Sequence, residues 1–203
     1  HEQGPGQNEI DFRYSQPLTA ADNAATFRTV VDSVAVRNGL AADFSPKPLS
    51  GQPGNGMHIN ISAKSADGAD VTPSLIAGIL AHIAEMTVFL NTVDASYLRF
   101  GGSKAPRYIS WSSENRSQLI RIPAAQGEYR RAELRSPDPL CNPYLAFALL
   151  IYADLDGIRS RPCPPRWRRP KPPPRAVPSS RTFCRRLSST TTPDNLTYRR
   201  KEG

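Results

Sequence analysis

The segment that most constrains the fold is residues 73–92, "PSLIAGILAHIAEMTVFLNT", which is apolar on almost every side. At 3.6 residues per turn, it predicts a helix of about five turns that is buried nearly all round. No uninterrupted apolar run approaches the length of about 20 residues that a membrane span needs, so we expect none. We interpret His82 within this helix as a packed histidine rather than a metal ligand. The rest of the chain must supply the surfaces that cover the helix.

Segments that alternate polar and apolar residues predict half-buried strands. Residues 8–14, "NEIDFRY", place Ile10 and Phe12 on one face. Residues 57–62, "MHINIS", have an apolar face backed by a polar one that carries His58, Asn60 and Ser62. A polar face on a strand with an apolar back is typical of a binding or catalytic site.

Two further strands are predicted over residues 118–123, "QLIRIP", and 129–135, "YRRAELR", around a glycine-containing turn at 124–128. The second strand places three charged side chains on one face: Arg131, Glu133 and Arg135. Because consecutive side chains of a strand point to opposite faces, the apolar residues between them face the core.

Two amphipathic helices complete the predicted body. Residues 19–40 show helical spacing of apolar residues, with Thr19 or Asp22 as the N-cap and Gly39 at the C-terminal end. Residues 142–158 form a Leu/Ala-rich helix with a proline in its first turn. The sum is an α+β fold in which helices pack against an antiparallel sheet.

Charge divides the chain into two parts. The net charge is +8, but residues 159–203 hold 13 of the Lys and Arg residues, two acids and nine of the 20 prolines, which leaves residues 1–158 slightly acidic. Such a tail has no apolar periodicity and cannot bury a core. We consider three interpretations: a disordered basic arm that binds polyanions, a proline-rich linker, or an out-of-frame translation, which the abrupt change of composition favours.

The three cysteines have neither metal-site spacing nor the pattern of a disulfide framework. Cys141 lies in the body, and the other two lie in the tail. We therefore expect a reducing cytoplasm as the location.

The predicted polar faces carry ligands that suit a hard divalent cation. Glu2, Glu9 and Glu133 offer oxygen ligands for Mg²⁺ or Mn²⁺, and a neutral His58 makes Mn²⁺ more plausible. Each glutamate taken alone is more commonly a surface residue. The prediction depends on their occurring together on strands that helices back.

A set of arginines accompanies these acids: Arg99, Arg116, Arg121, Arg131 and Arg135. Guanidinium groups bind carboxylate and phosphate bidentately, so several on one surface indicate an anionic ligand. The alternative for any one of them is an ion pair with Glu114, Glu128 or Glu133. Metal-binding acids and clustered arginines are what phosphoryl transfer needs, although no "GxxxxGK[ST]" loop is present.

Four segments together resemble the C-terminal catalytic domain of a type I glutamine synthetase: "HEQGPGQNEI", "KPLSGQPGNGMHINIS", "APRYISWSSENRSQLIRIP" and "RRAELRSPDPLCNPYLAFAL". The resemblance covers residues 1–158 in order. It implies a curved antiparallel half-barrel with packed helices. The implied cofactors are ATP and Mg²⁺ or Mn²⁺.

The resemblance assigns metal ligation to four residues: Glu2, Glu9, His58 and Glu133. Glu9 would hold one metal ion, and the last two would hold the other. It assigns substrate glutamate to Gly54, His58, Arg99 and Arg135.

For the nucleotide and its phosphates the resemblance implies five residues: Asn60, Ser62, Arg116, Arg121 and Arg131. Of the arginines, it gives a catalytic role to Arg99, Arg116 and Arg135. Asn60 and Ser62 would lie near adenine and ribose.

The reaction that the resemblance implies joins glutamate and ammonia. ATP phosphorylates the side-chain carboxylate of glutamate, and ammonia then displaces the phosphate to give glutamine. A related ligase that uses a polyamine or another amine is one alternative. A non-catalytic, polyanion-binding relative is another, suggested by the basic tail and its Trp167, although we consider a nucleic-acid partner improbable.

Two positions depart from the family pattern. Lys104 stands where the family has a glutamate that helps deprotonate ammonium, and a cation there would repel ammonium. Pro53 stands where the glutamate-binding loop often has an asparagine, which Asn55 could replace.

The chain starts at His1 without an initiator Met, which predicts a piece of a longer protein. The family has a β-grasp domain and further acidic ligands upstream, and its active sites form between subunits of a ring, commonly of twelve. We therefore expect a homo-oligomer for the whole protein and no activity for this chain alone.

Overall fold

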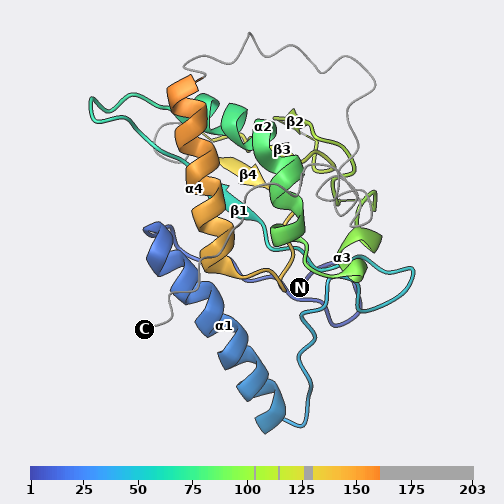
Figure 1. Cartoon of the computed structure of the whole chain (residues 1–203). Coiled ribbons are helices and arrows are strands. Elements are labelled where there is room, and N and C mark those ends of the chain that lie inside the picture. The colour runs from blue at the N-terminus through green and yellow to red at the C-terminus, as the bar shows by residue number, and fades with distance from the viewer. Residues whose placement is uncertain (103, 114, 126–129, 161–203) are drawn as a thin grey trace, which may run out of the picture.

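The computed structural model describes residues 1–102, 104–113, 115–125 and 130–160. Most of the predicted turn at 124–128 and residues 161–203 of the predicted tail lie outside these ranges. The elements run in the following order (Figure 1): α1 Pro17–Arg37, β1 Ile59–Ile61, α2 Thr72–Leu90, α3 Asp94–Leu98, β2 Trp111–Ser112, β3 Ile120–Arg121, β4 Ala132–Leu134 and α4 Pro143–Ser160.

The four short strands form one open sheet in the order β1-β4-β3-β2. β4 is antiparallel to both of its neighbours, β1 and β3. The predicted α+β class is confirmed. The expectation of antiparallel pairing throughout is wrong for β2 and β3, which run parallel, with Trp111 beside Ile120 and Ser112 beside Arg121.

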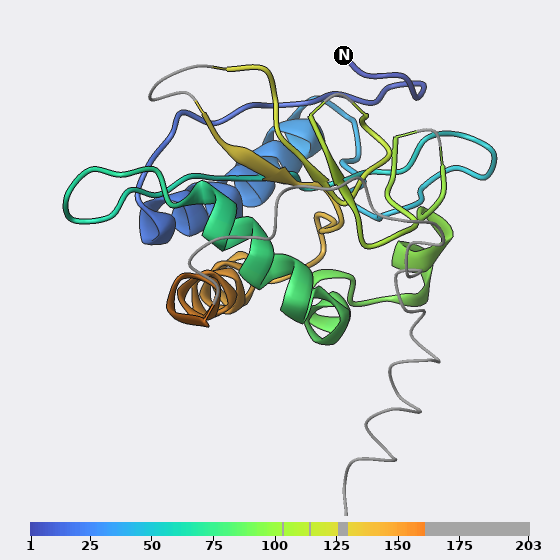
Figure 2. The same ribbon diagram turned by 90° about the horizontal axis from the view of Figure 1, so that it is seen from above.

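α2 and α4 cover one face of the sheet, and the N-terminal residues pass over the other face (Figure 2). The bounds of both helices agree with the prediction within two residues. By length and composition alone α2 could cross a membrane, but five of its apolar side chains are buried in the core cluster. Ile79, Ile83 and Leu90 are fully buried there with Leu119 and Ile120 of the sheet side.

The axes of α2 and α4 approach closely at two glycines. A Cβ atom on Gly78 would lie 2.0 Å from the carbonyl oxygen of Ala153, and one on Gly157 would lie 2.2 Å from that of Ser74. Neither position can hold a side chain without moving a helix backbone. This contact fixes how the helix pair lies under the sheet.

The N-terminal segment differs from the prediction. Residues 8–14 form no strand in the described structure, and Ile10 and Phe12 are exposed. Among the described residues no strand pairs with this segment. The ring of Phe12 packs edge-on against that of Phe27 in α1, with the ring centroids 5.5 Å apart. α1 begins at Pro17, ahead of the predicted caps, because proline is well suited to the first turn of a helix.

One buried carboxyl group in α4 should make stability depend on pH. Asp154 is only 8% exposed, its Oδ1 has no hydrogen-bond partner among the described residues, and burial raises its pKa to about 7. An unfolded aspartate has a pKa of 3.8, so between these values the folded chain retains a proton that the unfolded chain has lost. Stability therefore falls as pH rises from about 4 to above 7.

Asp154→Asn keeps the side chain neutral at every pH. We expect the variant to match the wild type at pH 4 and to be more stable at pH 8 by a few kcal/mol, since one pKa unit corresponds to about 1.4 kcal/mol. Urea denaturation at the two pH values measures the difference. Asp32→Asn, at an exposed position of α1, is the control and should change little. Equal stability of Asp154→Asn and the wild type at pH 8 would contradict the assignment.

Candidate active site

Three polar side chains lie in one row across the open face of the sheet. Asn60 of β1 is the register partner of Glu133 in β4, which is in turn the partner of Arg121 in β3. Their sequence neighbours Ile59, Leu134 and Ile120 are buried in the core. Strand alternation thus places the predicted polar faces together, on the side of the sheet away from α2 and α4.

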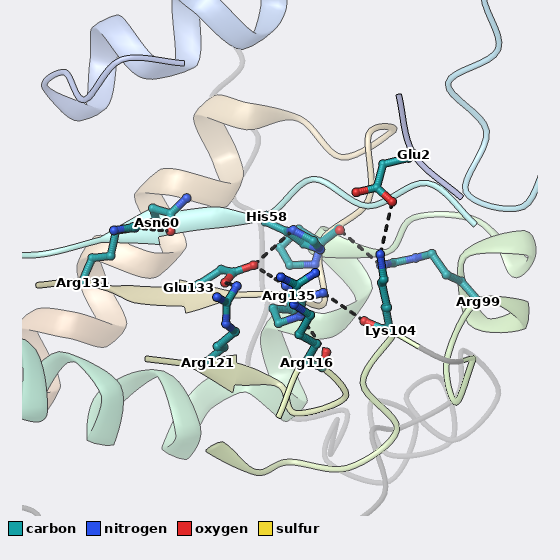
Figure 3. A network of polar contacts seen from close by, with 11 residues as sticks. Glu2, His58, Asn60, Arg99, Lys104, Arg116, Arg121, Arg131, Glu133 and Arg135 are labelled. Atoms are coloured by element: carbon teal, nitrogen blue, oxygen red, sulfur yellow. Dashed lines mark hydrogen bonds and ion pairs between the residues drawn. The ribbon is translucent and has the colours of Figure 1, made fainter. Parts of the chain in front are cut away.

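Glu133 is the hub of this row (Figure 3). Its Oε2 accepts a hydrogen bond from Nη1 of Arg121 at 2.8 Å, and its Oε1 accepts one from Nη1 of Arg135. Nδ1 of His58 lies 3.3 Å from the same Oε1. With its side chain only 7% exposed, the carboxylate is compensated by two guanidinium groups, as a buried charge must be.

His58 is held in its neutral form. Burial and the nearby charge of Arg135 lower the pKa of His58 to about 4, against a smaller opposing effect from Glu133. At neutral pH the imidazole is therefore uncharged, which is the form that binds metal ions. The ring remains 30% exposed, so a ligand can reach it.

Arg135 is fixed at both ends of its guanidinium group. Besides Glu133 it binds two backbone carbonyls, through Nε to Arg116 at 2.9 Å and through Nη2 to Lys104 at 3.1 Å. Burial lowers the pKa of Arg135 from its usual value. The Arg116 side chain itself is exposed at the rim of the site.

The remaining residues predicted for the nucleotide lie beside the row. Arg131 donates from Nε to Oδ1 of Asn60 at 3.0 Å, which joins two of them. Ser62 follows β1 directly and is half-buried. The structure therefore brings Asn60, Arg121 and Arg131 together with Glu133, while Arg116 lies at the edge.

Arg99 lies below the site rather than open to it. It is 4% exposed, and its Nη2 donates to the carbonyl of Pro137 at 3.2 Å and to that of Ser136. Desolvation lowers the pKa of Arg99 to about 10, and its Nε has no hydrogen-bond partner among the described residues. A buried guanidinium with an unused donor favours an anion as its missing partner.

A glycine-containing loop packs directly on Arg99. A Cβ atom on Gly54 would lie 2.8 Å from Cγ of Arg99 and 2.4 Å from the carbonyl oxygen of Pro46. One on Gly56 would lie 3.1 Å from Nη1 of Arg99 and 3.3 Å from Nε2 of His58. The absence of side chains at these glycines lets the loop lie against both groups.

Gln7 holds this loop in place, and sequence reasoning assigned it no role. Its Nε2 donates to Oδ1 of Asn55 at 2.8 Å and to the carbonyl of Gly54 at 3.1 Å. Asn55 also donates from Nδ2 to the carbonyl of Ser45 at 2.9 Å. The Asn55 side chain, which the sequence suggested as a substitute for the asparagine of the glutamate-binding loop, is thus already hydrogen-bonded at both ends of its amide. The signal for Gln7 was its place between two predicted metal ligands.

Apart from the Glu133 hub, Glu2 and Glu9 form a pair of acidic residues whose carboxyl groups share a hydrogen bond. This bond is the largest cause of a raised pKa at Glu9 and of a lowered pKa at Glu2. Nζ of Lys104 lies 3.3 Å from Oε2 of Glu2. Two carboxyl groups held together in this way favour a proton or a cation between them.

The four predicted metal ligands thus occur as two pairs, Glu2 with Glu9 and His58 with Glu133. Over the residues that the structure describes, no group of three or more His, Cys, Asp or Glu side chains is close enough to hold a metal ion. The donor chemistry of each pair still fits a hard divalent cation, with carboxylate oxygens and one neutral imidazole nitrogen.

Comparison with known proteins identifies relatives over most of the chain. A family model, glutamine synthetase catalytic domain, matches residues 1–169. The glutamine synthetase of Methanosarcina mazei is 50% identical over 175 residues, covering 79% of this chain and 39% of the relative. That of Thermus thermophilus is 47% identical over 178 residues, with 81% and 40% covered. The chain thus spans about two fifths of the length of these curated relatives.

Solved structures agree with these matches. A GmaS/ADP complex superposes with a TM-score of 0.80 at 30% identity, covering 93% of this chain and 49% of that one. The glutamine synthetase of Plasmodium falciparum gives a TM-score of 0.69 at 28% identity, with 73% and 32% covered.

The hub predicts a large loss of stability when Glu133 is neutralised. Glu133→Gln leaves Arg121 and Arg135 without their carboxylate, and breaking a buried ion pair costs about 3–5 kcal/mol. Asp70→Asn is the matched control, because Asp70 pairs with Arg130 at 3.5 Å on the surface, where such pairs contribute about 1 kcal/mol or less. Urea denaturation at pH 7 compares the two variants. If both variants lose the same free energy of unfolding, the ion pairs of Glu133 contribute no more than a surface ion pair.

Proposed function

The chain belongs to the glutamine synthetase family through its catalytic domain, and on that premise we propose that it serves the ATP-dependent ligation of glutamate and ammonia to glutamine. The observation that carries the proposal is the hub itself. Glu133, a neutral His58 and two fixed arginines lie on the open face of the sheet. Such a set suits the charge of a transferring phosphoryl group.

In the first step a side-chain carboxylate oxygen of glutamate attacks the γ-phosphorus of ATP, and ADP leaves. In the second, the amine nitrogen attacks the acyl carbon, phosphate leaves, and the nitrogen loses a proton. Divalent cations held by Glu2 with Glu9 and by His58 with Glu133 would offset phosphate charge. The residues of the chain supply position and fixed charge for both steps.

We assign the nucleotide side to the row of Asn60, Arg121 and Arg131, with Ser62 and Arg116 at its margins. The GmaS structure similar to this chain is a complex with ADP, which supports a nucleotide as a ligand. Arg121 and Arg131 would pair with phosphate oxygens. Arg135, held by Glu133 and two carbonyls, offers a fixed charge to the acyl phosphate.

We assign substrate glutamate to the edge of the Gly54–Gly56 loop, beside His58 and Arg99. The buried guanidinium of Arg99 has an unused Nε donor, and its Nη1 lies beside the loop and His58. A carboxylate there would accept the hydrogen bond that Nε of Arg99 makes to no described residue.

The relatives reported above are named glutamine synthetase, so the comparisons do not favour a polyamine ligase or a polyanion-binding protein. Lys104 also argues against a polyamine, because a lysine repels a polyamine with several positive charges more strongly than it repels an ammonium ion with one. We further propose a homo-oligomer, commonly a dodecamer in this family, and a cytoplasmic location.

The test uses a longer form of the protein, which spans the full length of the curated relatives. We expect glutamine from glutamate, ammonia and ATP, and γ-glutamyl hydroxamate when hydroxylamine replaces ammonia. Arg121→Gln removes a charge from the hub and should lower kcat/KM by about 100-fold or more. Arg130→Gln, which removes an arginine that pairs with Asp70 on the surface, should leave it unchanged. The proposal is wrong if the wild type forms neither product.

A further inference from the structure

Lys104 touches the acidic pair that would hold a metal ion. Its Nζ lies 3.3 Å from Oε2 of Glu2, with the two side chains 34% and 31% exposed (Figure 3). Glu2 in turn shares a hydrogen bond with Glu9. Within the described part of the chain, Lys104 is the one cationic side chain that forms an ion pair with either carboxyl group.

The backbone of Lys104 is held by a hydrogen bond to the site, which limits the positions that its side chain can reach. The carbonyl oxygen of Lys104 accepts a hydrogen bond from Nη2 of Arg135 at 3.1 Å, which ties it to the Glu133 hub. Next to it, the amide of Ala105 donates to the carbonyl of Gly102 at 3.2 Å. The fixed backbone directs the side chain toward the N-terminal segment that carries Glu2.

The charges around Glu2 explain why a lysine is stable here. Glu9 is in contact with it, so two carboxyl groups share this part of the N-terminal segment. Carboxyl groups gathered in this way repel one another unless a proton or a cation lies between them. The Lys104 ammonium supplies part of that positive charge.

We propose that Lys104 is a resident counter-ion of the Glu2–Glu9 pair and competes with a divalent metal ion for Glu2. The inference rests on the proposed function, which makes these two glutamates metal ligands. The ammonium group and the metal ion need the same carboxylate oxygen. Metal binding at Glu2 therefore requires Lys104 to withdraw, and Lys104 lowers the affinity of the site for the ion.

The expected effect is moderate. An ion pair whose side chains are about one third exposed contributes little. A lysine that stays near a doubly charged metal ion also repels that ion, and water screens the repulsion only in part. Together these effects predict that removal of the Lys104 charge raises metal affinity about tenfold.

The experiment is a titration of the full 203-residue chain with Mn²⁺ at pH 7.5, with free Mn²⁺ followed by electron paramagnetic resonance. Lys104→Met keeps the length of the side chain and removes its charge, and it should bind about tenfold more tightly than the wild type. Lys104→Arg keeps a cation and should bind like the wild type. Lys64→Met is the matched control, because it removes one exposed lysine from the loop between β1 and α2.

A double-mutant cycle assigns the gain to the proposed contact. In a Glu2→Gln background, Lys104→Met should bring a clearly smaller gain, because competition for the Glu2 oxygen is gone and only the direct repulsion between Lys104 and the ion remains. The inference is overturned if Lys104→Met binds Mn²⁺ no more tightly than Lys64→Met, even though the metal site itself then stands. Absence of Mn²⁺ binding in every protein would overturn both the inference and the metal site of the proposed function.

Discussion

The ion pairs of the Glu133 carboxylate are the contacts on which the open face of the sheet depends. Glu133 lies at the centre of the sheet, where β4 pairs with both neighbours, and it binds two arginines beside a neutral histidine. Its neighbours along the strand, Ala132 and Leu134, are buried in the core beneath α2 and α4. One three-residue strand therefore joins the packing of the helices to the arrangement of the charges.

The acids of the site are balanced by basic residues of the same chain. Arg121 and Arg135 compensate Glu133, and Lys104 compensates Glu2. A ligand that enters such a site replaces existing ion pairs with new ones, so its free energy of binding is smaller than the number of its contacts suggests. Arg99 differs from these arginines, because it is buried, donates to two backbone carbonyls and keeps an Nε donor without a partner among the described residues.

The sequence predicts well what strand and helix periodicity control. The alternation in residues 57–62 placed Asn60 on the polar face, and the apolar residues 73–92 became the core helix α2. It could not predict that residues 8–14 form no strand, because pairing depends on a neighbour that alternation does not reveal. Nor could it show that Arg99 is buried or that Gln7 holds the Gly54 loop, since both contacts join distant parts of the chain.

The most direct test of the central claim is a crystal structure of the chain with Mn²⁺ and ADP, in which anomalous scattering locates the metal. We predict a manganese peak at coordination distance from Glu133 and His58, with ADP phosphates against Arg121 and Arg131. The account is contradicted if manganese and ADP bind elsewhere while Arg121 and Arg135 still occupy both oxygens of Glu133.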